Sequence, residues 1–408
     1  MALQISNNDT PDPFMIKCDG AYILTFTIGN RVELWRSSLL HDFHDNVAAK
    51  RIIWSPFPSR PLEPAADECR QPQDAQAEMS DIWAPELHMV EDYWWVYFCA
   101  AHPSKGNPSH RMYVLRGPHV SSDPMEPTSK FTLEGPLRGL PDHWAIDGTV
   151  FTLNNELYLC YSGWPLDRND DLKQELFIAK MLDPVTADPS LGVHVISTPE
   201  HGWEKFKDPG DGPWHEINEG PQWLEMQSFR GLVYSAGASW TSNYNLGILE
   251  YIGGDPLQAQ SWRKHPTPLL TNDPSGQGPY APGHCSYPQP FICFSVNDFF
   301  FRFVPSPDDS QMWIVYHATP SPHDGWANRK GRCQPLELRD GVPYAGQHPV
   351  SVSGLALPSG SFIPAQSTPL PETVLGPGPW SNDPDVQRLK AKGKNIWQKL
   401  RRRLSKAS

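Results

Sequence analysis

The chain has 408 residues, including 30 Gly and 44 Pro, and a net charge of −12. Residues 388–408 hold nine Lys or Arg and no acid, so residues 1–387 carry −21. An acidic body of this kind excludes nucleic acid as a natural partner and tolerates neutral substrates. The many turn residues, together with 16 Trp, 13 Tyr and 17 Phe, favour a protein built from short β-strands.

The N-terminal residues MALQISNNDTPDPF contain neither a charged leader nor an apolar run, which predicts that no signal peptide is present. We therefore expect a cytoplasmic protein, with secretion as the alternative if the N-terminus is incomplete. No apolar run is long enough to span a bilayer. The seven Cys are scattered and form no CxxC pair, so they predict buried free thiols rather than disulfides or a metal site.

Ten segments with alternating or continuous apolar character follow one another along the chain, each bounded by turn residues. They form five pairs of predicted strands: 22–27 with 32–38, 94–101 with 111–117, 156–164 with 174–182, 232–239 with 246–253, and 311–318 with 332–339.

A shorter segment opens each pair: 12–18, 84–90, 147–153, 219–226 and 283–290. Five units of one plan, repeated at irregular intervals, predict an all-β, five-bladed β-propeller. A β-sandwich is the structural alternative, but it does not explain the fivefold plan.

The propeller is predicted to occupy residues 1–354. Turn-rich residues 39–80 and 183–215 are expected to be loop insertions, and the aromatic segment 291–309 to be a lid, an extra subsite or a packed loop. A Pro/Ser/Gly-rich extended segment, 355–384, follows. The basic tail, 385–408, is expected to be helical or disordered; a solvated tail is favoured over contact with an anionic membrane.

Acidic residues stand at the openings of three units: Asp12, Asp147 and Glu219. Glu86 and His284 lie in the openings of the other two. The first strand of each propeller blade lines the central channel, so these positions are expected to converge at one mouth. Glycoside hydrolysis needs two carboxyl groups in different protonation states, and a third carboxylate nearby helps one of them to hold its proton.

Each of these residues also has an ordinary structural explanation. Asp-Pro is a common turn dipeptide, so Asp12 by itself carries little weight. Asp147 could start a strand, Glu86 could cap a turn, and His284 could be a buried histidine with its hydrogen bonds satisfied, as His317 on a core strand is expected to be.

Seven motifs in chain order together resemble glycoside hydrolase family 43: DPF (12–14), DIWAPELH (81–88), HRMYVL (110–115), AIDGTVF (145–151), NEGPQ (218–222), PGHCS (282–286) and WIVYHA (313–318). The resemblance covers about residues 9–350. It implies a five-bladed propeller and an inverting glycosidase.

The resemblance also implies roles for single residues. Asp12 matches the general base, Asp147 the residue that orients and tunes the acid, and Glu219 the general acid. Trp83 and Glu86 match the strand that lines the substrate pocket.

His284 matches a channel histidine that in some members binds calcium or lies beside it. One imidazole with waters is a poor site for this ion, so we expect no required cofactor, with calcium in the central channel as the alternative. Cys285 departs from the Asn that commonly follows this histidine.

Inversion predicts that the carboxyl groups of Asp12 and Glu219 lie about 6.5–9.5 Å apart, and we expect a raised pKa for Glu219 from burial and from Asp147. The motif wording favours release of α-L-arabinofuranosyl residues from oligosaccharides or cell-wall polysaccharide. β-Xylosidase, endo-1,5-α-L-arabinanase and a non-catalytic carbohydrate-binding propeller are the alternatives. The sequence leaves open the sugar, the linkage, endo or exo action, and the oligomeric state.

Overall fold

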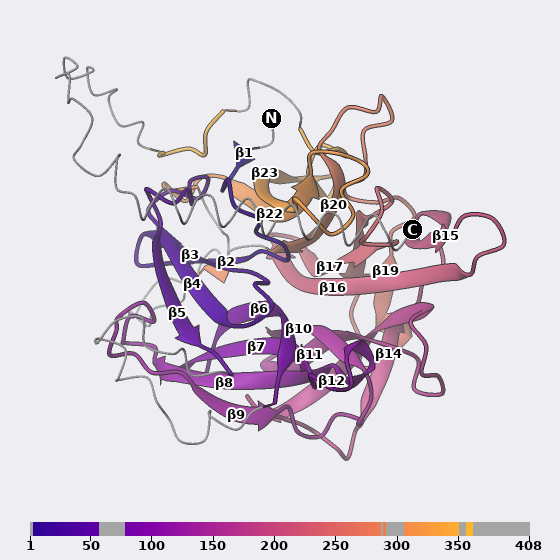
Figure 1. Cartoon of the computed structure of the whole chain (residues 1–408), viewed down its shortest axis with the longest axis horizontal. Coiled ribbons are helices and arrows are strands. Elements are labelled where there is room, and N and C mark those ends of the chain that lie inside the picture. Colours follow the sequence, from indigo (N-terminus) through magenta and orange to yellow (C-terminus); the bar gives the residue numbers. More distant parts are fainter. Residues whose placement is uncertain (1–2, 57–77, 287–288, 291–305, 351–355, 362–408) are drawn as a thin grey trace, which may run out of the picture. The chain divides into compact units, whose positions relative to one another are not determined.

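The computed structural model describes residues 3–56, 78–286, 289–290, 306–350 and 356–361, and it is an all-β structure (Figure 1). Its strands form five sheets of the same plan. The hydrogen bonding joins the sheets of blades 3 and 4 into one ten-stranded sheet. The joint is a short parallel pairing, in which Lys173 lies opposite Glu216 and Gln174 opposite Ile217.

Four strands make up each blade, and they run antiparallel from the inner edge outward. Blade 1 contains β2 (Phe14–Cys18), β3 (Ala21–Thr25), β4 (Val32–Ser37) and β5 (Ala49–Trp54), with β21 (Gln289–Pro290) beside β2. Blade 2 contains β6 (Ser80–Val90), β7 (Tyr93–Ala101), β8 (Arg111–His119) and β9 (Thr132–Pro136). Blade 3 contains β10 (Ala145–Leu153), β11 (Glu156–Gly163), β12 (Lys173–Asp183) and β14 (Val193–Ser197), with β13 (Thr186–Ala187) on β12.

Blade 4 contains β16 (Trp214–Met226), β17 (Phe229–Ala236), β18 (Asn245–Tyr251) and β19 (Trp262–Lys264), with β15 (Lys205–Lys207) on β16. Blade 5 contains β20 (Tyr280–Ser286), β22 (Met312–Thr319), β23 (Lys330–Arg339) and β1 (Leu3–Gln4), with β24 (Val342–Tyr344) on β23. Within the described residues, three short 3₁₀ turns, η3 (Asn107–Ser109), η4 (Gly202–Glu204) and η5 (Ala259–Ser261), lie in connections.

The blades form a closed ring. The five inner strands contact one another in the order β2, β6, β10, β16, β20 and back to β2. A separate hydrophobic core fills each of the five spaces between successive blades, including the space between blade 5 and blade 1. The middle strands are therefore buried on both faces, which is why their sequences read as continuous apolar runs rather than as alternating ones.

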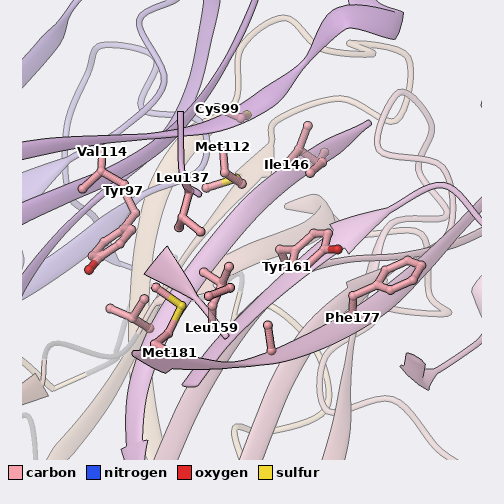
Figure 2. Close-up of a cluster of buried hydrophobic side chains, with 14 of the residues drawn as sticks. Tyr97, Cys99, Met112, Val114, Leu137, Ile146, Leu159, Tyr161, Phe177 and Met181 are labelled. Carbon is pink, nitrogen blue, oxygen red and sulfur yellow. The ribbon is translucent and has the colours of Figure 1, made fainter. Parts of the chain in front are cut away.

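The core between blades 2 and 3 shows how this packing works. Figure 2 shows Tyr97 and Met112 of blade 2 in one cluster of buried side chains with Ile146, Leu159 and Phe177 of blade 3. All of these side chains are at most 6% exposed. Burying large side chains of this kind stabilises the blade interface by about 1.5–3 kcal/mol for each one.

The N-terminal strand closes the ring without a covalent bond. β1 pairs antiparallel with β23, with Leu3 opposite Cys333 and Gln4 opposite Arg332. The next residue, Ile5, is fully buried in the core between blades 5 and 1. The first and last parts of the propeller are thus held together by one shared sheet and one shared core, and this arrangement brings Asp12 close to residues beyond 280.

The predicted middle strands are confirmed, but the expectation of loops was wrong at two places. Residues 39–80 contain β5, and residues 183–215 contain β13, β14 and β15. These outer strands are short and partly exposed, so they lack the apolar runs that mark the middle strands. Residues 57–77 and 291–305, most of 355–384, and the tail 385–408 lie outside the described residues.

Within the described part of the chain, no helix has the length and apolar character needed to cross a membrane.

Candidate active site

In every blade a residue in the left-handed backbone region lies within the inner strand or just before it, at a corresponding place. The five residues are Asp12 (φ 54°), Ala84 (44°), Asp147 (56°), Gly220 (54°) and His284 (41°). In four of the strands the pairing with the next strand breaks across this residue as a β-bulge, and in blade 1 the strand begins just after it. Bulges and left-handed non-glycine residues gather at functional sites because they redirect side chains at the cost of local strain.

These bulges bring Asp12, Asp147 and His284 together. Nδ1 of His284 lies 3.4 Å from Oδ1 of Asp12 and 3.9 Å from Oδ2 of Asp147. The backbone N–H of Gly220 donates a hydrogen bond of 3.0 Å to Oδ2 of Asp147, so Glu219, the preceding residue, is fixed beside the same carboxylate. Residues from blades 1, 3, 4 and 5 therefore meet at one point of the inner ring.

Asp12 is surrounded by positive and hydrogen-bonding groups. Nη1 of Arg329 lies 3.2 Å from its Oδ1, and Thr27 bonds to the same carboxylate. Burial alone would raise the pKa of Asp12, but Arg329, His284 and His317 outweigh it and hold this pKa well below the usual value. Asp12 is consequently a carboxylate across the whole physiological pH range.

Nδ1 of His317 accepts a hydrogen bond of 3.1 Å from the backbone N–H of Asp12. An accepting Nδ1 carries no proton, so this histidine is neutral, and burial lowers its pKa well below the ordinary value. His317 is thus the buried, hydrogen-bonded histidine expected from the sequence, and it also fixes the backbone of Asp12.

Glu219 has the opposite surroundings. It is 7% exposed, and burial raises its pKa to about 7, with a further contribution from the charge of Asp12. A hydrogen bond from Tyr244 and the charge of Arg329 act against this rise. Burial, Glu219 and Asp12 also raise the pKa of Asp147. Because Glu219 and Asp147 are neighbours, the proton held near neutral pH belongs to the pair.

Tyr244 approaches Glu219 only because residue 283 is Gly. A Cβ at position 283 would lie 1.8 Å from Cε1 of Tyr244. Tyr244 also bonds to Ser235, whose Oγ accepts a hydrogen bond of 2.7 Å from the backbone N–H of His284. This chain of contacts links the acid in blade 4 to the histidine in blade 5.

Glu86 lies next to this group, in blade 2. It is 1% exposed and accepts hydrogen bonds from Gln222 and, at 2.7 Å, from Nε2 of His88. Its charge acts on both Asp147 and His284, which places it in the same buried network.

Trp83, also in β6, is half-buried and stacks on His110, with ring centroids 3.9 Å apart. No contact of Trp83 with the three acids is recorded among the described residues.

The donor set near His284 does not fit calcium. Calcium prefers several carboxylate and carbonyl oxygens, whereas Asp12 here faces a guanidinium and two imidazoles. Among the residues the structure describes, no three His, Cys, Asp or Glu side chains gather so that they could hold a metal ion.

Sequence reasoning missed several members of the site: Arg329, Tyr244, Ser235 and Gln222. Gln222 stands in the NEGPQ motif, two residues after the left-handed Gly220, so the motif itself carried a signal. Ser235 lies on the second strand of blade 4, and Tyr244 and Arg329 lie in connections between second and third strands, where no pattern marks them.

Glycoside cleavage needs one ionised carboxylate and one carboxyl that keeps its proton, and the inner ring of this propeller brings Asp12, whose pKa is lowered, close to Glu219 and Asp147, whose pKa values are raised. The family model of glycosyl hydrolases family 43 matches residues 4–290, and the chain belongs to this family. It is a glycosidase, and enzymes of this family generally need no cofactor.

Named relatives give a narrower comparison. An extracellular exo-α-(1→5)-L-arabinofuranosidase from Streptomyces chartreusis is 29% identical over 304 residues, which are 74% of this chain and 76% of the relative. An enzyme of the same name from Streptomyces avermitilis is 30% identical over 68% of this chain, which spans about half (51%) of that relative. The crystal structure of an α-L-arabinofuranosidase from Lactobacillus brevis matches 86% of this chain and 98% of its own, with a TM-score of 0.66 and 26% identity.

The prediction of a cytoplasmic protein was wrong. The two Streptomyces relatives are named extracellular enzymes, which points to secretion. The prediction used only residues 1–14, and the compartment is decided by transport rather than by the propeller or its site.

Proposed function

We propose that this glycosidase is an inverting, exo-acting α-L-arabinofuranosidase that releases terminal arabinofuranosyl residues from arabino-oligosaccharides or plant cell-wall polysaccharide. The observation that carries the proposal is the contrast between two carboxyl groups in one site. Arg329 and two histidines surround Asp12, whereas Glu219 is buried beside the hydroxyl of Tyr244.

In the proposed mechanism Glu219 gives its proton to the glycosidic oxygen as the bond to the anomeric carbon breaks. Asp12 takes a proton from a water molecule that attacks the same carbon from the opposite face. Asp147 keeps Glu219 in place through the N–H of Gly220, and the two neighbouring carboxyl groups share the proton that is held near neutral pH. The separation of about 6.5–9.5 Å between the two carboxyl groups that inversion requires stays a prediction.

The choice of sugar rests on the relatives. Four curated relatives are named α-L-arabinofuranosidases, two of them exo-α-(1→5)-L-arabinofuranosidases. Solved structures named as xylosidase or endo-arabinase are 13% identical to this chain and support the fold alone. We propose Glu86 and Trp83 as residues of the substrate pocket, with His284 between the two acids.

The test is hydrolysis of 4-nitrophenyl α-L-arabinofuranoside, 4-nitrophenyl β-xyloside and linear arabinan, with the first product anomer followed by proton NMR. We expect the arabinofuranoside to be cleaved, arabinose to be released singly from arabinan, and the β-anomer to appear first. Initial α-anomer would refute inversion, and faster cleavage of the xyloside would refute the sugar. Binding of oligosaccharide without turnover would make the protein a carbohydrate-binding propeller.

A further inference from the structure

Two tryptophans meet on the connections that flank the site. Residues 237–244 connect β17 to β18 in blade 4, and residues 320–329 connect β22 to β23 in blade 5. In an antiparallel blade, the connection between the second and third strands lies at the same end as the start of the first strand. Both connections therefore stand at the mouth where the acids gather, and each one ends in or contains a site residue, Tyr244 and Arg329.

The two indoles are held in a fixed arrangement. The rings of Trp240 and Trp326 pack edge to face, with centroids 5.9 Å apart at 71°. Nε1 of Trp326 donates a hydrogen bond of 3.1 Å to Oγ of Ser239, across the two blades. His215, four residues before Glu219 on β16, packs its ring edge-on against Trp240 at 5.0 Å. Because these contacts already restrict the two side chains, binding a ligand would cost little additional side-chain conformational entropy.

Trp326 is nevertheless 63% exposed, the largest exposed fraction among the exposed large hydrophobic side chains of the described residues. Its hydrogen bond to Ser239 already satisfies the indole nitrogen, so a flat apolar surface faces the solvent without any folding reason. Polar groups border it, since Asp324 and Asn328 lie in the same connection and bond to each other. A small aromatic surface with a polar border suits the C–H face and hydroxyls of one sugar unit better than it suits a protein partner.

The position of the pair tells which part of a substrate would reach it. Tyr244, at the end of the Trp240 connection, bonds to Glu219, the proposed proton donor to the leaving oxygen. The backbone carbonyl of Trp326 accepts a hydrogen bond of 3.2 Å from Nε of Arg329. The pair thus lies on the two connections whose last residues, Tyr244 and Arg329, contact the proposed acid and the proposed base.

We infer that Trp240 and Trp326 form a subsite for the leaving part of the substrate, where they stack against the sugar unit that follows the scissile bond. This inference rests on the proposed function. It means that the enzyme prefers oligosaccharides over short synthetic substrates, because only a chain with further sugar units reaches both the acids and the tryptophans.

The experiment compares Trp326→Ala, Trp240→Ala and wild type on α-1,5-linked arabinopentaose and on 4-nitrophenyl α-L-arabinofuranoside. For the pentasaccharide we expect kcat/KM to fall at least about tenfold, equivalent to about 1.4 kcal/mol, with the loss in KM. The loss on the nitrophenyl substrate should be smaller. Trp326→Phe should restore most of the activity on the pentasaccharide, because it keeps an aromatic face.

Trp214→Ala is the matched control. Trp214 is 55% exposed and adjoins His215 on β16, but alternation along the strand turns it to the opposite face. It should leave both substrates unaffected. Equal losses on both substrates in Trp326→Ala, or no loss on the pentasaccharide, would overturn the subsite.

Failure of the proposed function gives a different result. A wild-type protein that cleaves neither substrate refutes the enzymatic proposal, and calorimetric titration with arabinopentaose then tests the subsite directly. Binding that weakens in Trp326→Ala and persists in Trp214→Ala would support it. Equal binding in all three proteins, or none in any, would overturn it.

Discussion

The guanidinium of Arg329 lies 3.2 Å from the carboxylate of Asp12, although 317 positions of the chain separate them. Ring closure by β1 makes this pair possible, because β1 joins the N-terminal segment to β23, which Arg329 immediately precedes. Arg329 lowers the pKa of Asp12 and also that of Glu219, so one cation acts on both proposed catalytic groups.

Replacing Arg329 with Met should therefore shift both limbs of the pH profile in the same direction. Without the cation the pKa values of Asp12 and Glu219 both rise, so activity is lost at low pH and retained further into the alkaline range. We expect a shift of the acid limb by about one to three pH units in kcat/KM. Arg263→Met, which removes an exposed arginine paired with Glu250, is the control. An unshifted acid limb would show that Arg329 does not tune Asp12.

The wild-type pH profile should itself be broad on the acid side. Asp12 works without its proton, and its pKa is well below the usual value, so protonation abolishes activity only at low pH. Glu219 works with its proton, and its pKa is raised to about 7, so activity falls as the pH rises through that value. Measurement of kcat/KM against pH checks both limbs; an alkaline limb near pH 4, where a free Glu titrates, would contradict the assignment of Glu219.

Tyr244→Phe should move only the alkaline limb. The hydroxyl of Tyr244 stabilises the ionised form of Glu219, so its removal raises the pKa of Glu219 further and extends activity to higher pH. The control is Tyr316→Phe, since Tyr316 is also buried but its hydroxyl donates a hydrogen bond of 2.6 Å to Gln334. A downward shift in Tyr244→Phe would mean that the tyrosine holds the acid in its protonated form.

Substitution of the two proposed catalytic groups should separate their roles. Asp12→Asn should lower kcat by about a thousandfold on every substrate, because the attacking water loses its base. Glu219→Gln should do the same on arabino-oligosaccharides but much less on the nitrophenyl substrate, whose leaving group departs without a proton. Glu225→Gln, near the other end of β16, is the control. Equal loss on both substrates in Glu219→Gln would exclude it as the proton donor.

Gly283→Ala should disturb the site and the fold together. The added Cβ would lie 1.8 Å from the buried ring of Tyr244, and forcing such a contact costs about 1–3 kcal/mol. We expect a lower midpoint of thermal unfolding and a lower kcat. Gly202→Ala is the matched control, because a Cβ there meets no atom within 4 Å. A Gly283→Ala protein with unchanged stability and activity would show that Tyr244 can move aside without cost.

The sequence predicted the middle strands and the inner strands of the blades well, because both carry strong local patterns. β7 and β11 are buried on both faces and read as apolar runs. The outer strands β5 and β14 face solvent on one side, so their composition resembles that of loops, and the sequence misassigned them. The choice of Asp12, Asp147 and Glu219 came from their shared position in a repeated plan rather than from any of the residues alone.

The sequence by itself determined the repeated plan of strands and the acids that open three of its units, because both depend only on residues that are near one another in the chain. Only the tertiary structure decided the state of each acid. Arg329, His317 and Tyr244 reach the site from other strands and connections once the ring is closed, and burial and charge at that point lower the pKa of Asp12 and raise those of Glu219 and Asp147. Protonation depends on distances across the ring, which no local pattern of residues encodes.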